Sequence, residues 1–204
     1  MLKISIIAAI AGHILCGLSD CLLGYSKKGR LDLKQINNAE KMSEMFADMP
    51  LSYPLCSALL GVFAITLFSF GYFGLSGWMS EYSAIASTIM FIAAAVYAVP
   101  IAAHHVLFAV IEWLYIRLGR TNEAREAVLE LQKKTIAPMF VGYLGLLVFT
   151  VTLFVMIISG KTALPQWTCI FNTVVAMILL LPTKLPAKGN IAGAVMFLGL
   201  LFVI

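Results

Sequence analysis

The chain has 204 residues, of which 61% are hydrophobic and only 12% are charged. Its mean hydropathy is +0.96, and soluble domains carry about twice this charged fraction, so the composition excludes a water-soluble globule and a disordered chain. The net charge of +4 is too small to favour nucleic acid, and we expect no such partner. The sequence therefore predicts an integral membrane protein.

A helix needs about 20 apolar residues to cross a hydrocarbon core of about 30 Å. Apolar runs bounded by charges, Pro or Gly predict six transmembrane helices in one domain, residues 1–204. Their expected bounds are 4–25, 51–75, 82–118, 136–159, 166–181 and 190–204. The expected fold is an all-α integral membrane protein, a six-helix transmembrane bundle with short amphipathic cytoplasmic helices. A cleaved signal peptide is a weaker interpretation of the first run, which exceeds a normal signal in length.

The third predicted helix would be about 55 Å long at about 1.5 Å per residue. It must tilt, bend at Pro100 or project beyond the bilayer, and we expect it to project into the cytoplasm. The last two predicted helices are only about 24 and 22 Å long by the same rise. The final one can therefore be a half-spanning helix.

Lys and Arg placement predicts the orientation. With the amino terminus outside, twelve of the fourteen basic residues fall in inner segments, and only Lys3 and Lys161 lie outside. This bias predicts a multi-pass protein of the cell (inner) membrane, with both termini outside and cytoplasmic loops at 26–50 and 119–135. Both loops carry apolar residues at helical spacing, which predicts surface helices that contain Met42, Met45, Phe46 and Met49 in one and Ala124, Ala127, Val128 and Leu131 in the other.

Ionisable side chains inside the predicted spans are the candidate functional residues, since each costs about 2.5–3.5 kcal/mol at mid-bilayer. Counting the rise along the first and third helices places four of them in or just below the inner half, where they could converge. We expect a polar cavity there, open to the cytoplasm or the inner leaflet. The candidate catalytic residues are Asp20, His104, His105 and Glu112. The candidate ligand-binding residues are His13, Tyr97, Phe108, Tyr143 and Asn172.

Carboxylates and imidazoles in a poorly hydrated cavity can exchange a proton with a bound molecule. No His-x-x-x-His or His-Glu-x-x-His spacing occurs, so we expect no metal and no other cofactor, although zinc held by the same four candidates stays an alternative. Structural interpretations compete with the functional ones. Asp20 could pair with Lys27, His13 could bond two helices, and Glu112 could be interfacial.

Three stretches carry a resemblance to a known family. They are Gly17-Leu18-Ser19-Asp20-Cys21-Leu22-Leu23-Gly24-Tyr25, the pair His104-His105, and Pro165-Gln166-Trp167 together with Asn190. The chain resembles a group of uncharacterised bacterial multi-pass membrane proteins over most of its length. The resemblance implies a compact helical bundle in which the first-helix aspartate and the third-helix histidine are the positions of interest.

Three functions are compatible with these residues. The favoured hypothesis is a protein that binds or acts on a lipid-like or other apolar small molecule by acid/base chemistry, with membrane lipids as its surroundings. The second is a small proton-coupled transporter that works as a homodimer, since six short helices offer little room for a solute path. The third is a structural scaffold in which the polar groups only hold helices together.

Overall fold

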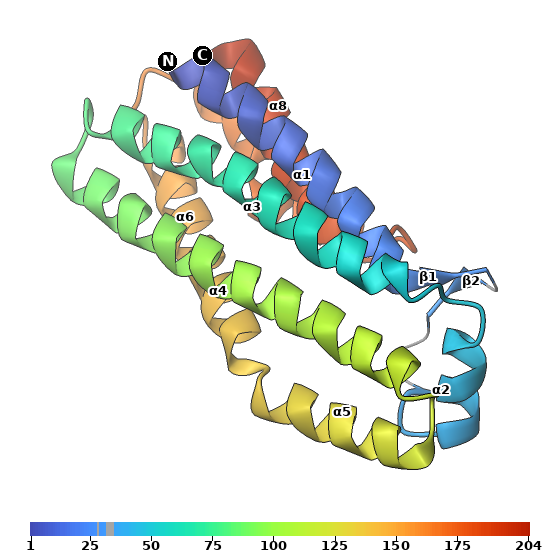
Figure 1. The fold of residues 1–204 in the computed structure, drawn as a ribbon. Coiled ribbons are helices and arrows are strands. Elements are labelled where there is room, and N and C mark those ends of the chain that lie inside the picture. The colour runs from blue at the N-terminus through green and yellow to red at the C-terminus, as the bar shows by residue number, and fades with distance from the viewer. Residues whose placement is uncertain (28, 32–34) are drawn as a thin grey trace.

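The computed structural model describes residues 1–27, 29–31 and 35–204, and it is helical except for a small hairpin (Figure 1). The described elements are α1 (Leu2–Gly24), β1 (Tyr25–Ser26), β2 (Gly29–Arg30), α2 (Ala39–Phe46), α3 (Ser52–Met79), α4 (Ala84–Arg117), α5 (Asn122–Lys134), α6 (Ala137–Ile158), the 3₁₀ helix η2 (Gln166–Phe171), α7 (Thr173–Leu180) and α8 (Lys188–Val203). The all-α fold is confirmed.

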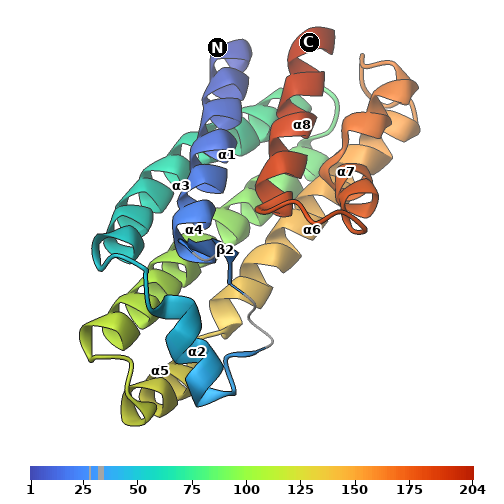
Figure 2. The ribbon, with the colours of Figure 1, turned by 90° about the vertical axis from the view of Figure 1, so that its right-hand side faces the viewer.

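The four long helices α1, α3, α4 and α6 run up and down in a bundle, and each packs on the next along the chain. Helix α8 packs on α1, and η2 joins α8 to α6, so the helices close into a ring (Figure 2). Both chain ends lie at the same end of the bundle, and α2 and α5 lie at the opposite end. The termini and the two main loops therefore lie at opposite ends of the bundle, as predicted.

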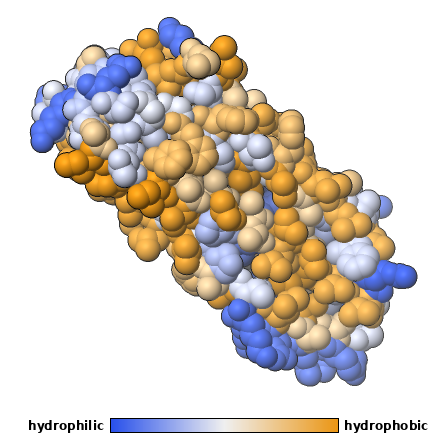
Figure 3. Space-filling view, turned by 60° about the vertical axis from the view of Figure 1, so that its left-hand side comes forward, coloured by the Kyte–Doolittle hydropathy of each residue, from blue (hydrophilic) through white to orange (hydrophobic). Residues whose placement is uncertain are grey.

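Four stretches of the described chain are long and apolar enough to cross a membrane: α1, α3, α4 and the segment that contains α6. Their outer faces expose large apolar side chains such as Ile14, Phe63, Phe91 and Leu144. Figure 3 shows an apolar surface along the molecule, with hydrophilic residues gathered towards its two ends. Such a distribution is typical of a lipid-facing belt between two aqueous regions.

The last two predicted spans take a different form. The segment expected at 166–181 is divided into η2 and the two-turn α7, and the one expected at 190–204 is the 16-residue α8. Asn172 breaks the first of these, since its side chain accepts a hydrogen bond from the Val174 amide and caps α7. The fully six-span bundle is therefore not confirmed, although α7 and α8 do form an antiparallel pair (Figure 2).

Two apolar clusters hold the molecule together. The larger lies within the ring and is rich in aromatic side chains, including Phe68, Tyr72, Phe149 and Phe197. The smaller lies below, where the last turns of α4 meet the amphipathic helices α2 and α5. Helix α4 has 34 residues, about 51 Å of helix, and is longer than the 23-residue α1.

Candidate functional site

A polar network lies within the bundle, and its centre is the contact between Asp20 of α1 and His105 of α4. Asp20 Oδ1 lies 3.6 Å from His105 Nδ1, and the two side chains are 35% and 9% exposed. Asp20 comes four residues before the end of α1, about 6 Å along the axis, so the pair lies near the end of the bundle opposite the termini. The carboxylate thus has access to the surface while the imidazole is enclosed.

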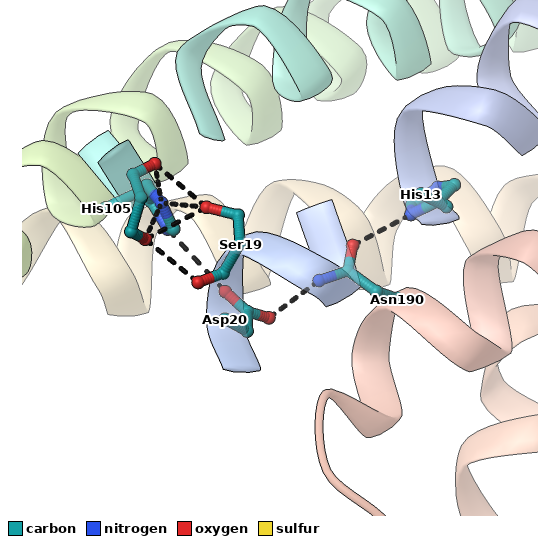
Figure 4. A network of polar contacts seen from close by, with 6 residues as sticks. His13, Ser19, Asp20, His105 and Asn190 are labelled. Atoms are coloured by element: carbon teal, nitrogen blue, oxygen red, sulfur yellow. Dashed lines mark hydrogen bonds and ion pairs between the residues drawn. The ribbon is translucent and has the colours of Figure 1, made fainter. Parts of the chain in front are cut away.

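Two serines surround the far side of the His105 ring (Figure 4). Nε2 lies 3.0 Å from Ser19 Oγ, 3.3 Å from Ser57 Oγ and 3.1 Å from the Ser57 carbonyl oxygen. Both serines are fully buried. Ser57 lies on α3 and Ser19 on α1, so the imidazole joins three helices.

The hydrogen bonds of the two serines leave His105 Nε2 as a donor, because the Ser19 and Ser57 hydroxyls both donate to backbone carbonyl oxygens. With its proton directed to the Ser57 carbonyl oxygen, Nε2 leaves Nδ1 without a proton in a neutral ring. Nδ1 then faces the carboxylate without repulsion only if the ring is doubly protonated or if Asp20 is protonated. In either state one proton lies on Nδ1 or on the Asp20 carboxylate, whose nearest atoms are 3.6 Å apart.

A second arm of the network runs from Asp20 through α8 to the middle of the bundle. The Asn190 amide Nδ2 donates to Asp20 Oδ2 at 2.8 Å, so its carbonyl oxygen is the atom that faces His13 Nδ1 at 3.1 Å. His13 Nδ1 must then be the donor, and Nε2 accepts from the Tyr72 hydroxyl at 3.2 Å. The network fixes both the amide orientation and the His13 tautomer.

Two local features place these side chains. Ala187 has a φ of 48° in the turn before α8, and this left-handed conformation brings Asn190 to the depth of Asp20. The backbone of Gly193 lies directly against the His13 ring, where a Cβ atom would overlap the imidazole. His13 is 1% exposed and stacks on Phe68 with ring centroids 4.6 Å apart. The polar groups are therefore held in a tightly packed aromatic environment.

The other candidate ligand-binding residues lie in several places. Tyr97 is buried against Phe68 and Tyr72. Tyr143 of α6 is 52% exposed. Asn172 is 3% exposed and donates to the Thr150 carbonyl oxygen at 2.9 Å, besides capping α7, so its amide is used by the fold.

The four candidate catalytic residues do not gather at one point. Asp20 and His105 are in contact, as the expected depths allowed. The half-buried His104 packs against Phe108, with ring centroids 6.0 Å apart. It takes no part in the polar network described above. Glu112 lies seven residues beyond His105, about 10 Å along α4. It belongs to the region where α4 meets α2 and α5, and Phe108 lines the same region.

The Asp20, His105 and Ser19 side chains follow the order carboxylate, imidazole, hydroxyl, which activates a serine nucleophile in hydrolases. Ser19 is, however, fully buried and lies 2.8 Å from the Ser57 carbonyl oxygen, to which it donates. A substrate carbonyl cannot reach its Oγ in this conformation. The arrangement is suited to proton exchange through the accessible Asp20. Among the described residues, no three His, Cys, Asp or Glu side chains come together as metal ligands do.

Four members of the network were not among the candidates: Ser19, Ser57, Tyr72 and Asn190. The depth count that selected Asp20 could have found three of them. Ser19 precedes Asp20, while Ser57 and Asn190 lie in the first two turns of helices that begin at the same end of the bundle. No comparable signal marks Tyr72, since tyrosines are common in apolar helices.

Comparison with known proteins places the chain in a family. The model of a family of unknown function, DUF6796, matches residues 1–204, and the chain belongs to this family. The resemblance to an uncharacterised family is thereby confirmed. Neither the curated proteins nor the solved structures contain a match to the chain.

Proposed function

We propose that this member of the DUF6796 family binds or acts on a lipid-like molecule by acid/base chemistry, with Asp20 and His105 as the proton-exchanging pair. The single observation that carries the proposal is the contact of 3.6 Å between Asp20 Oδ1 and His105 Nδ1. It joins an imidazole that is 9% exposed to a carboxylate that is 35% exposed. A proton at this place can leave or arrive through Asp20 while Ser19 and Ser57 hold the ring in position.

The side from which a molecule would approach supports a lipid-like ligand. Helix α1 packs on α3 and α8, and α6 packs on α4 and η2, so in the described part of the chain α1 and α6 are not packed along each other. The side chain of Asp20 on α1 is 35% exposed and Tyr143 on α6 is 52% exposed, so both have access to the surface. The surrounding helices expose apolar side chains, which favours ligands that arrive from the membrane.

Charge placement supports the proposed orientation. The turn between α7 and α8 contacts the hairpin after α1, because Arg30 Nη1 donates to the Lys184 carbonyl oxygen at 3.2 Å. Lys184 and Lys188 therefore join the basic residues of the two main loops at one end of the bundle. In a cell membrane this end would face the cytoplasm, and Asp20 would lie in the inner leaflet.

The test is the identity of what the protein retains. The wild type and the Asp20→Asn and His105→Gln variants are purified in mild detergent, and copurifying molecules are measured by mass spectrometry. We expect both variants to lose a lipid-like molecule that the wild type retains, with helix content unchanged. The matched control is Asp48→Asn, an exposed acid near α2, which should retain it.

The competing functions give different results. A transporter predicts a pH-driven flux in sealed vesicles that Asp20→Asn abolishes, without selective retention of a molecule. A scaffold predicts that the same variants lower thermal stability and change nothing else. Identical sets of retained molecules in the wild type and both variants would overturn the proposal.

A further inference from the structure

Glu112 is a buried carboxylate that lacks a hydrogen-bond partner among the described residues. The residue is 4% exposed, and neither Oε1 nor Oε2 has a donor in the described part of the chain. A carboxylate in this position has lost its hydration without gaining a counterion or a donor, which is destabilising. Groups of this kind are frequent at binding sites, where a ligand completes them.

The carboxylate lines a small cavity between the last turns of α4 and the helices α2 and α5. The cavity measures about 20 Å³, which accommodates one water-sized group. Its walls are otherwise mostly aromatic or aliphatic and include Phe46, Phe108, Tyr115, Met42 and Val128. Gln132, which is half-buried, adds one amide to this wall.

The nearby guanidinium groups are engaged with other atoms. Arg120 Nε donates to the Phe46 carbonyl oxygen at 2.9 Å, and its Nη2 donates to that of Met49 at 3.4 Å. Arg125 Nη1 donates to the Asn37 carbonyl oxygen at 2.8 Å. These contacts fasten α2 and the segment before it to the α4–α5 region, and neither arginine donates to Glu112.

We propose that Glu112 anchors a second binding site, which takes the ammonium group of a primary amine that carries an apolar tail. An ammonium group has the size of a water molecule, it neutralises the carboxylate, and aromatic rings favour a cation beside them. The apolar walls supply few oxygen ligands for a metal ion, and the cavity has room for the ammonium group alone, so the attached hydrocarbon would lie outside it. The site lies about 10 Å along α4 from His105, so it does not depend on the function proposed for Asp20.

The ammonium group could belong to an aminophospholipid headgroup or to a soluble amine, and two arms distinguish these sources. The first titrates hexylamine into the purified full-length protein and follows the midpoint of thermal unfolding, with hexanol as the uncharged probe of equal length. The second compares nanodiscs of phosphatidylethanolamine with nanodiscs of phosphatidylcholine, whose ammonium group carries three methyl groups. The variants are Glu112→Gln and, as the matched control, Glu126→Gln on the exposed face of α5.

We expect hexylamine, but not hexanol, to raise the unfolding midpoint of the wild type and of Glu126→Gln. Glu112→Gln should bind the amine about tenfold or more weakly, since it loses a hydrogen bond to a charged group. Without amine, Glu112→Gln should unfold at the wild-type temperature or above it, because it removes a buried carboxyl group that has no hydrogen-bond partner among the described residues. A response only in phosphatidylethanolamine nanodiscs would assign the site to a lipid headgroup.

Several results would overturn the proposal. One is the absence of any amine-dependent shift in either arm, and another is an equal shift with hexanol, which would indicate a merely apolar cavity. A third is an unfolding midpoint of Glu112→Gln well below that of the wild type without amine. It would show that the carboxylate has a structural partner, and Glu112→Met should then be destabilised as well.

Discussion

Gly61 of α3 and His105 of α4 meet so closely that a Cβ atom at position 61 would overlap the imidazole ring. The glycine therefore makes the room in which the ring reaches Ser19 and Ser57. Small residues at helix interfaces in membranes commonly allow such close approach. Here the close approach brings a titratable side chain into contact with two other helices.

Gly61→Ala should accordingly displace His105 and destabilise the fold by about 1–3 kcal/mol, the usual cost of overpacking. The measurement is reversible unfolding in detergent. Gly77→Ala is the control on the same helix, because nothing lies within 4 Å of the position of its Cβ atom. Equal stabilities for the two variants would contradict the packing described for His105.

Asn190→Ala should cost about 1–3 kcal/mol of stability, because it leaves His13 Nδ1 and Asp20 Oδ2 without their shared partner. Asn190→Asp preserves the shape but places a second carboxylate beside Asp20, so it should destabilise at neutral pH and recover in acid. Thermal unfolding across pH measures both effects. A stability of Asn190→Asp that does not vary with pH relative to the wild type would argue against this bridge.

His13 and Tyr72 should be energetically coupled. His13→Phe retains stacking on Phe68 but loses both ring hydrogen bonds, and Tyr72→Phe loses one of the same bonds. In a double-mutant cycle, the combined variant should be about 1 kcal/mol more stable than the sum of the single effects predicts. Additive effects would mean that the Nε2–hydroxyl contact contributes nothing.

Much of the fold could be predicted from the sequence because length and apolar content are local properties. The four long helices and the amphipathic α2 and α5 follow from them, and so does the depth that Asp20 and His105 share. Counting the rise along the helices could not separate the site of Glu112 from that of His105. It gives the depth of a residue on its own helix, but not which other helices pack at that depth. At the level of His105, α1 packs nearby, while the described residues around Glu112 belong to α2, α4, α5 and the segment before α2.

The end of the chain was harder to predict because its geometry depends on single side chains. Asn172 is polar enough to cap α7, which divides an apolar run into η2 and α7. The left-handed Ala187 sets the start of α8 and hence the position of Asn190. Neither effect changes the apolar content of the segment, so hydropathy does not reveal them.

Arg120→Ala should loosen the packing of α2, because this side chain donates hydrogen bonds to the Phe46 and Met49 carbonyl oxygens at and just beyond the end of α2. We expect cleavage by chymotrypsin within residues 26–50 to become at least about tenfold faster, since proteolysis follows local opening. Arg117→Ala, at the exposed last residue of α4, is the control. If both variants are cleaved at the wild-type rate, these hydrogen bonds do not hold α2 in place.

The proposal that Asp20 and His105 exchange a proton is tested most directly by nitrogen-15 NMR of the histidine rings. The chain has only three histidines, so single His→Gln variants assign each ring. We expect His105 Nδ1 to resonate as a protonated or proton-sharing nitrogen, and Asp20→Asn to move this signal while the His104 signals stay unchanged. A bare His105 Nδ1, or a His105 spectrum that Asp20→Asn does not alter, would contradict the proposed proton-exchanging pair.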